Sequence, residues 1–139
     1  MAPITIEPNQ IIRQTLIATG TELYTQIGTK AAVLRKQTGW ATTDKCVVFA
    51  IRGGNTDPDM PVMRVSVQFL CYGGDTLVES ATTVYRALVD RLNGANRIGV
   101  AAGIMLSAVE EVAGQPLVDP DTKEVYVFCA YEMELRGAT

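Results

Sequence analysis

Apolar and polar residues alternate most regularly between residues 62 and 72. The apolar positions are Met63, Val65, Val67, Phe69 and Cys71. The polar positions between them are Arg64, Ser66 and Gln68. A period of two is typical of a strand that buries one face, so this segment predicts a half-buried strand.

The spacing of apolar residues changes to that of a helix over residues 77–92. Residues 72–75, with the sequence Tyr-Gly-Gly-Asp, end the strand and begin the helix. Apolar side chains then recur every three or four positions, which predicts a long amphipathic helix. Asn93 and Gly94 provide a C-terminal stop.

The N-terminal third predicts shorter elements. Residues 10–20 form a short amphipathic helix with Asn9 as the expected N-cap and Gly20 as its stop. Residues 22–27 read as a short strand, because apolar and β-branched residues alternate there. Residues 30–40 are expected to be irregular, with at most one helical turn.

A continuous apolar, β-branched run at residues 45–52 predicts a central strand covered on both faces. Residues 53–61 form a polar, glycine-bearing loop. The loop joins this strand to the one that begins at Val62, so we expect an antiparallel hairpin with a wide connection.

The C-terminal third predicts a second hairpin. Residues 94–99 are expected to be an exposed loop, and residues 103–112 a strand that the glycine and proline of residues 113–116 interrupt. Residues 119–123 have the Asp-Pro-Asp composition of a tight turn. The last strand is predicted at residues 124–136, with alternating faces.

This order predicts one α+β domain over residues 1–139. We expect a mostly antiparallel sheet of four to five strands, with the long helix packed on one face and a short N-terminal helix. The second face of the last strand carries Tyr126 and Phe128 among charged residues. A sheet face of this mixed character often meets a neighbouring subunit.

Composition and charge narrow the classes of function. The net charge is −3 and the pI is about 4.9, and basic residues are scattered along the sequence. These properties argue against a surface that binds the phosphates of a nucleic acid. No apolar run is long enough to cross a membrane, and the N-terminus has no signal-peptide pattern, so we expect a protein of the cytosol or of an assembly built there.

The residues needed for common catalytic or metal chemistry do not converge in the sequence. The chain has no His, and its three Cys, each in an apolar run, are expected to be small buried hydrophobes. Asn55, Asp57 and Asp59 could ligate Ca²⁺, but the pattern lacks the central Gly and the final Glu of a calcium loop. Turn formation explains these acidic residues more simply. We therefore expect no enzyme, metal or cofactor.

Two stretches carry a resemblance to a known family. The first is residues 64–75 followed by the helical residues 84–88, and the second is residues 115–122 followed by residues 125–128. Together they resemble the tail-terminator, or tail-completion, proteins of long-tailed bacteriophages. The likeness covers roughly residues 9–136 and rests on strand and turn signatures rather than on ligand positions.

The resemblance implies a structural virion protein rather than an enzyme, without a cofactor. Members of this family form a ring, commonly a homohexamer, on the head-proximal end of the tail tube. The ring is assembled in the host cytoplasm, stops polymerisation of the tail tube protein and offers a docking surface to the head connector protein. DNA passes through its centre without specific binding.

Candidate positions for these contacts follow from the predicted surfaces. The subunit-interface candidates on the second sheet face are Arg64, Gln68, Tyr126, Phe128, Glu132 and Glu134. The docking-loop candidates are Asn55, Asp57, Asp59, Asn96 and Arg97. Glu132 and Glu134 also have a simpler interpretation. They would lie on a solvent-exposed strand face and discourage edge-to-edge association of sheets.

Two other classes of function remain open at this stage. One is a small α+β ligand-binding or regulatory module that oligomerises through its sheet, which predicts an apolar pocket between helix and sheet. The other is a small enzyme that uses Asp or Glu, which predicts a cleft lined by two acids with raised pKa values.

Overall fold

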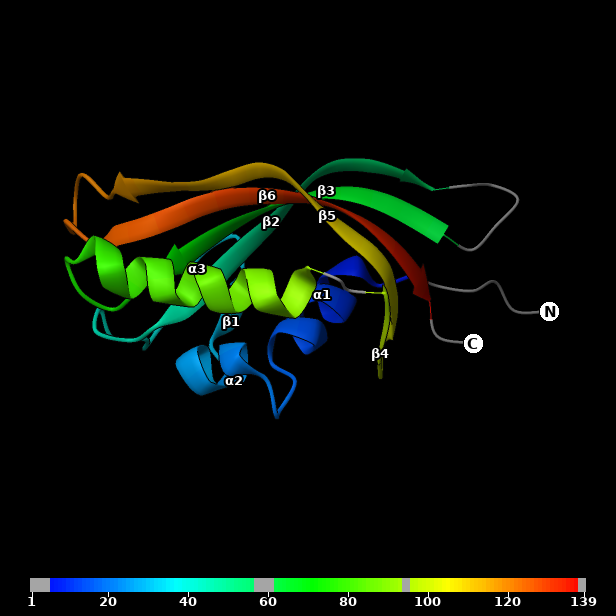
Figure 1. The fold of residues 1–139 in the computed structure, drawn as a ribbon, viewed down its shortest axis with the longest axis horizontal. Coiled ribbons are helices and arrows are strands. Elements are labelled where there is room, and N and C mark those ends of the chain that lie inside the picture. The colour runs from blue at the N-terminus through cyan, green and yellow to red at the C-terminus, as the bar shows by residue number, and fades with distance from the viewer. Residues whose placement is uncertain (1–5, 57–61, 94–95, 138–139) are drawn as a thin grey trace.

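The computed structural model describes residues 6–56, 62–93 and 96–137 of the chain. A curved sheet forms one layer, and three helices lie together on one of its sides (Figure 1). This arrangement confirms the α+β class. The elements in chain order are α1 (Pro8–Leu16), α2 (Glu22–Ile27), β1 (Ala31–Val33), β2 (Cys46–Thr56), β3 (Val62–Tyr72), α3 (Val78–Leu92), β4 (Asn96–Val100), β5 (Gly103–Val118) and β6 (Val125–Gly137).

The sheet has six strands in the order β1-β2-β3-β6-β5-β4. Only β1 runs parallel to its neighbour among these strands, and the other pairs are antiparallel. The prediction of four to five strands was therefore too low, while the mostly antiparallel character is confirmed. The central pair β3–β6 keeps its register from Val62 opposite Arg136 to Tyr72 opposite Tyr126.

The strands that flank this central pair are bulged. β2 loses register with β3 between Ile51 and Gly54, where Gly53 and Gly54 have φ values of 108° and 156°. A Cβ on Gly54 would lie 2.2 Å from the carbonyl oxygen of Arg64, so no larger residue fits there. β5 loses register with β6 at three places. Bulges bend and twist a sheet, which accounts for the curvature in Figure 1.

Helix α3 packs along the inner face of the sheet, which we define as the face toward the helices. Its apolar stripe is buried, and Leu88 has no exposed surface. The carboxylate of Asp75 braces the turn that leads into the helix, because it accepts hydrogen bonds from the Ser80 hydroxyl (2.6 Å) and the Leu77 amide (2.8 Å). These bonds, that of Ser80 first, lower the pKa of Asp75. The predicted role of this turn as a helix start is confirmed.

The hydroxyl of Tyr85 ties α3 to β5. It donates to Glu110 Oε2 (2.7 Å) and accepts from the amide of Gly114 (3.0 Å). A Cβ on Gly114 would lie 2.7 Å from the Tyr85 ring, so the glycine lets the ring approach the strand. Residues 113–116 therefore do not end the strand as predicted, since β5 continues through them with bulges.

The prediction of a strand at residues 22–27 was wrong, because this segment is helix α2. The Thr21 hydroxyl accepts a hydrogen bond from the Tyr24 amide (3.0 Å), which caps the helix. Gly28 follows the helix at a φ of 60°. Leu23 and Ile27 are buried, and their spacing of four places them on the same side of this helix.

Three further strand predictions need correction. β2 extends to Thr56, so Gly53–Thr56 belong to a strand rather than to a loop. β4 occupies residues that were expected to be an exposed loop. β1 lies inside the segment expected to be irregular. Each of these pieces is a strand because it pairs with another strand: the end of β2 with β3, β4 with β5, and β1 with β2.

The core lies between the inner face and the helices. The predicted inner face of β6 is confirmed, because every second residue from Val125 to Leu135 is buried. Tyr131 stacks edge-on against Phe69, with ring centroids 5.8 Å apart. The three cysteines are free and buried, as expected.

We predict that Leu88→Ala lowers the free energy of unfolding by about 2–5 kcal/mol, because it removes a fully buried side chain of α3 and leaves a cavity. Urea denaturation measures the effect. Leu77→Ala removes the same atoms from a side chain that is 58% exposed, and should cost less than about 0.5 kcal/mol. Equal losses in the two variants would contradict the assigned packing of α3.

A second prediction concerns pH. Partial burial, followed by the hydrogen bond to Glu110, raises the pKa of Tyr85 to about 12. In the unfolded chain, Tyr85 loses this proton at pH about 10. The contribution of its hydroxyl to the free energy of unfolding is therefore complete below that pH, and it is lost as the pH rises toward about 12. We expect Tyr85→Phe to be less stable than wild type at pH 8, with a difference that shrinks above pH about 10. A difference that grows over this range, in urea titrations, would contradict the assignment.

Candidate subunit interface

The sheet face turned away from the helices, here called the outer face, carries all six predicted interface residues. The register places Tyr72 opposite Tyr126 and Arg64 opposite Glu134 across the β3–β6 pair. Residues paired in register share a face, and the intervening residues point into the core. The alternation in the sequence therefore assigned these six residues to the correct face.

One end of the outer face is apolar. Cys46, Val48 and Tyr72 form a small buried cluster there, against which Trp40, Leu70 and Tyr126 pack. The rings of Tyr72 and Tyr126 lie with centroids 5.3 Å apart. Burial is the main reason that the pKa of Tyr72 rises to about 12. Trp40, which the sequence could not place, thus helps to cover this end.

A partly buried ion pair closes the apolar end. Lys36 Nζ lies 2.7 Å from Glu124 Oε1, and it also sits over the Tyr72 ring, 4.2 Å from the centroid. Glu124 is only 8% exposed, and its second carboxylate oxygen accepts from the Thr122 hydroxyl (3.1 Å). This contact pins the segment after β1 to the start of β6. No local sequence signal identifies a pair 88 residues apart.

The other end of the outer face is charged. Arg64 Nε lies 3.0 Å from Glu134 Oε1, and Arg52 Nε donates to Gln68 Oε1 (3.1 Å). The Arg64 and Glu134 side chains are 60% and 37% exposed, so their ion pair adds little to stability. Glu132 is exposed beside them. Several predicted contact residues therefore already have partners within the chain.

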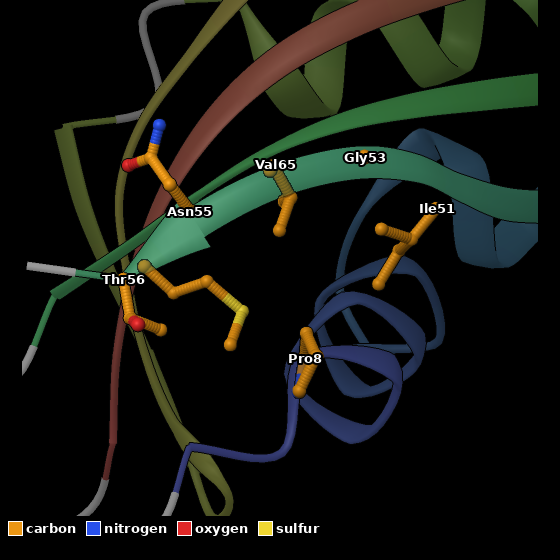
Figure 2. A pocket seen from close by; sticks show the side chains of 8 residues that line it. Pro8, Ile51, Gly53, Asn55, Thr56 and Val65 are labelled. Carbon is orange, nitrogen blue, oxygen red and sulfur yellow. The ribbon is translucent and has the colours of Figure 1, made fainter.

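Two hollows flank the bulge of β2. On the inner side, a hollow of about 380 Å³ lies between β2, β3 and the start of α1. In Figure 2, Ile51 and Val65 point from the strands toward Pro8. On the outer side, a hollow of about 300 Å³ brings together Arg52, Arg64, Glu111 and Glu132. Arg52 and Glu111 were not among the predicted interface residues.

The predicted docking residues lie in strands, and not in loops, where the structure describes them. Asn55 lies exposed in β2 and contributes to both hollows. Asp57 and Asp59 lie outside the described residues. Asn96 and Arg97 belong to β4, where Arg97 has a φ of 64° and is exposed. The candidate docking segment 94–99 is therefore an edge strand over the part that the structure describes.

Metal-ligating side chains are scattered over the described parts of the chain. Within residues 6–56, 62–93 and 96–137, no group of three or more His, Cys, Asp or Glu side chains could hold a metal ion. Among the helices in these ranges, none has the length and apolar character to cross a membrane.

Fully buried side chains of α3, Leu88 among them, pack against the sheet. A ligand-binding module would need its pocket at this interface between helix and sheet.

Comparison with known proteins shows a likeness in fold. No protein-family model and no curated protein matches the sequence. The fold is similar to that of a chain in the solved structure "Virion of native gene transfer agent (GTA) particle", with a TM-score of 0.67. The match covers 94% of this chain and 95% of that chain at 12% sequence identity. At this identity the likeness establishes the fold.

We predict that Lys36→Met lowers the free energy of unfolding by about 1–3 kcal/mol, because it leaves the buried Glu124 carboxylate without its counter-ion. Thermal or urea unfolding measures the loss. Arg86→Met, on the exposed side of α3, removes the same charge and should change stability by less than about 0.5 kcal/mol. A neutral effect of Lys36→Met would show that the ion pair does not hold this segment.

Proposed function

We propose that this chain is a structural virion protein that assembles with other virion proteins. The observation that carries the proposal is the shared fold, over nearly the full length of both chains, with a chain from a gene transfer agent virion. The exposed apolar side chains Val109, Leu117 and Val118 of β5 support it, since exposed apolar surface often marks a contact with another chain. The proposed role is non-enzymatic.

The finer proposal is that the chain ends the phage tail tube. Copies would form a ring, with six as the expected number, at the head-proximal end of the tube, joining the tube protein to the head connector. The resemblance of residues 64–75 and 115–122 to tail-terminator proteins supports this role. The net charge of −3 also suits a ring whose central channel lets DNA pass without binding it.

A ring that contacts the tube protein on one side and the head connector on the other requires several different contact surfaces. Subunit contacts that close on themselves are heterologous, which means that two different patches of each copy meet. The six outer-face candidates are proposed to contribute to these contacts. The exposed residues at the ends of β2 and β4, including Asn55 and Arg97, are proposed to face the tube or the connector.

The test is assembly of the purified protein, alone and with its tail tube protein. We expect sedimentation of a species about six times the 15.0 kDa chain mass, and rings with a central hole in electron micrographs. Added to polymerising tube protein, the chain should cap tubes and shorten them. A monomer at all concentrations, which neither forms rings nor changes tube length, would overturn the proposed function.

A further inference from the structure

Exposed apolar side chains gather at one end of the sheet. Within the described residues, six large apolar side chains are exposed, and four of these belong to two Leu-Val pairs. The exposed fractions are 58% for Leu77, 48% for Val78, 43% for Leu117 and 58% for Val118. Apolar residues scattered singly are normal on a protein surface, whereas a group at one place indicates a contact surface.

The two pairs lie together because α3 begins where β5 ends. Tyr126 is opposite Tyr72, the last residue of β3, on one side and opposite Leu117 on the other, so β3 and β5 end at the same level. A Cβ on Gly73 would lie 2.3 Å from the amide nitrogen of Ala81, so the first turns of α3 pack against this end of the sheet. Figure 1 shows the start of α3 and the end of β5 at the same end of the molecule. We use the name end patch for the surface formed by Leu77, Val78, Leu117 and Val118.

Val118 lies on the helix side of β5. It is paired with Val125, whose side chain is in the core, and paired residues share a face. The Tyr85 hydroxyl accepts from the Gly114 amide (3.0 Å), which fixes α3 beside β5. From this contact, Val78 is about 10 Å back along the helix, and Val118 is about 13 Å further along the strand. The first turn of α3 and the last residues of β5 therefore reach a similar level.

The border of the end patch is acidic. The charged residues of segments 75–79 and 117–123 are Asp75, Glu79, Asp119, Asp121 and Lys123. Four acidic residues and one basic residue give these two segments a net charge of −3. The adjacent Lys36 and Glu124 pair with each other, so they add no net charge. The end patch of a second copy would be repelled by this border, whereas a surface bordered by Lys or Arg would be attracted.

The opposite end of the sheet has a different surface. The docking candidates Asn55 and Arg97 lie there, at the level of Arg64, which is about 26 Å along β3 from Tyr72. Both candidates are exposed and polar. A chain with one apolar end and one polar end can present a different surface to each of the two proposed neighbours of a ring.

We infer that the end patch binds the tail tube protein, whose matching surface is apolar and bordered by basic residues. The inference rests on the proposed function and names the contact that stops the tube. The tube end must be held permanently, because a ring that dissociated would let tube growth resume. Permanent contacts are more hydrophobic than transient ones, so the apolar end suits the tube. The polar end then faces the head connector.

The experiment measures tube capping and ring formation separately in the full chain. Leu77→Asp and Val118→Asp each place a charge in the end patch, from two different elements. Each should raise the concentration at which half of the tubes made of tail tube protein are capped at least about tenfold, while rings form as in wild type. Gln10→Asp, which adds the same charge on the exposed surface of α1, is the matched control and should cap tubes as wild type.

A third variant tests the acidic border. Asp121→Lys reverses an exposed charge and leaves the apolar side chains in place, so it should also raise the concentration for half-capping. An unchanged or lower concentration would overturn the basic character assigned to the partner surface.

The outcomes separate this inference from the proposed function. Circular dichroism and thermal unfolding establish that each variant is folded. Folded variants of the end patch that cap tubes as wild type would overturn the inference. Variants that no longer form rings would also overturn it, because the patch would then belong to the subunit contact. A wild-type chain that neither forms rings nor changes tube length would instead overturn the proposed function.

Discussion

The unbroken pairing of β3 with β6 is the constraint on which the other surfaces depend. Its constant register lines up the inward side chains of both strands into the wall that α3 covers. The strands on either side, β2 and β5, lose register at bulges, so the sheet bends around the helices at its margins. The helices then fill the inner side, which leaves the outer face turned away from the core.

The outer face divides into parts with different physical roles. Its apolar end is sealed within the chain by Trp40 and by Lys36, so it contributes mainly to folding. Its charged end stays hydrated, and Arg64 and Glu134 already partner each other there. Alternation in the sequence was enough to place the six interface candidates on one face. It could not show that Arg52 and Glu111 line the same hollow, because that depends on strand order.

The elements with long, regular patterns were predictable from the sequence, as β3, β6 and α3 show. The segment that forms α2 was not, because Leu23 and Ile27 fit a strand face and a helix face equally well over so short a length. Glycine and proline in β5 suggested an end to the strand, but bulges at a sheet margin accommodate both. The interface role of the candidate residues remains a prediction.

The central claim is that copies of this chain associate through two different surfaces into a closed ring. Native mass spectrometry of the purified protein over a range of concentrations tests it most directly. The account predicts a monomer and one larger species of fixed copy number, which does not grow as concentration rises. A dimer as the only assembly, or a ladder of species without a limit, would contradict a heterologous contact that closes.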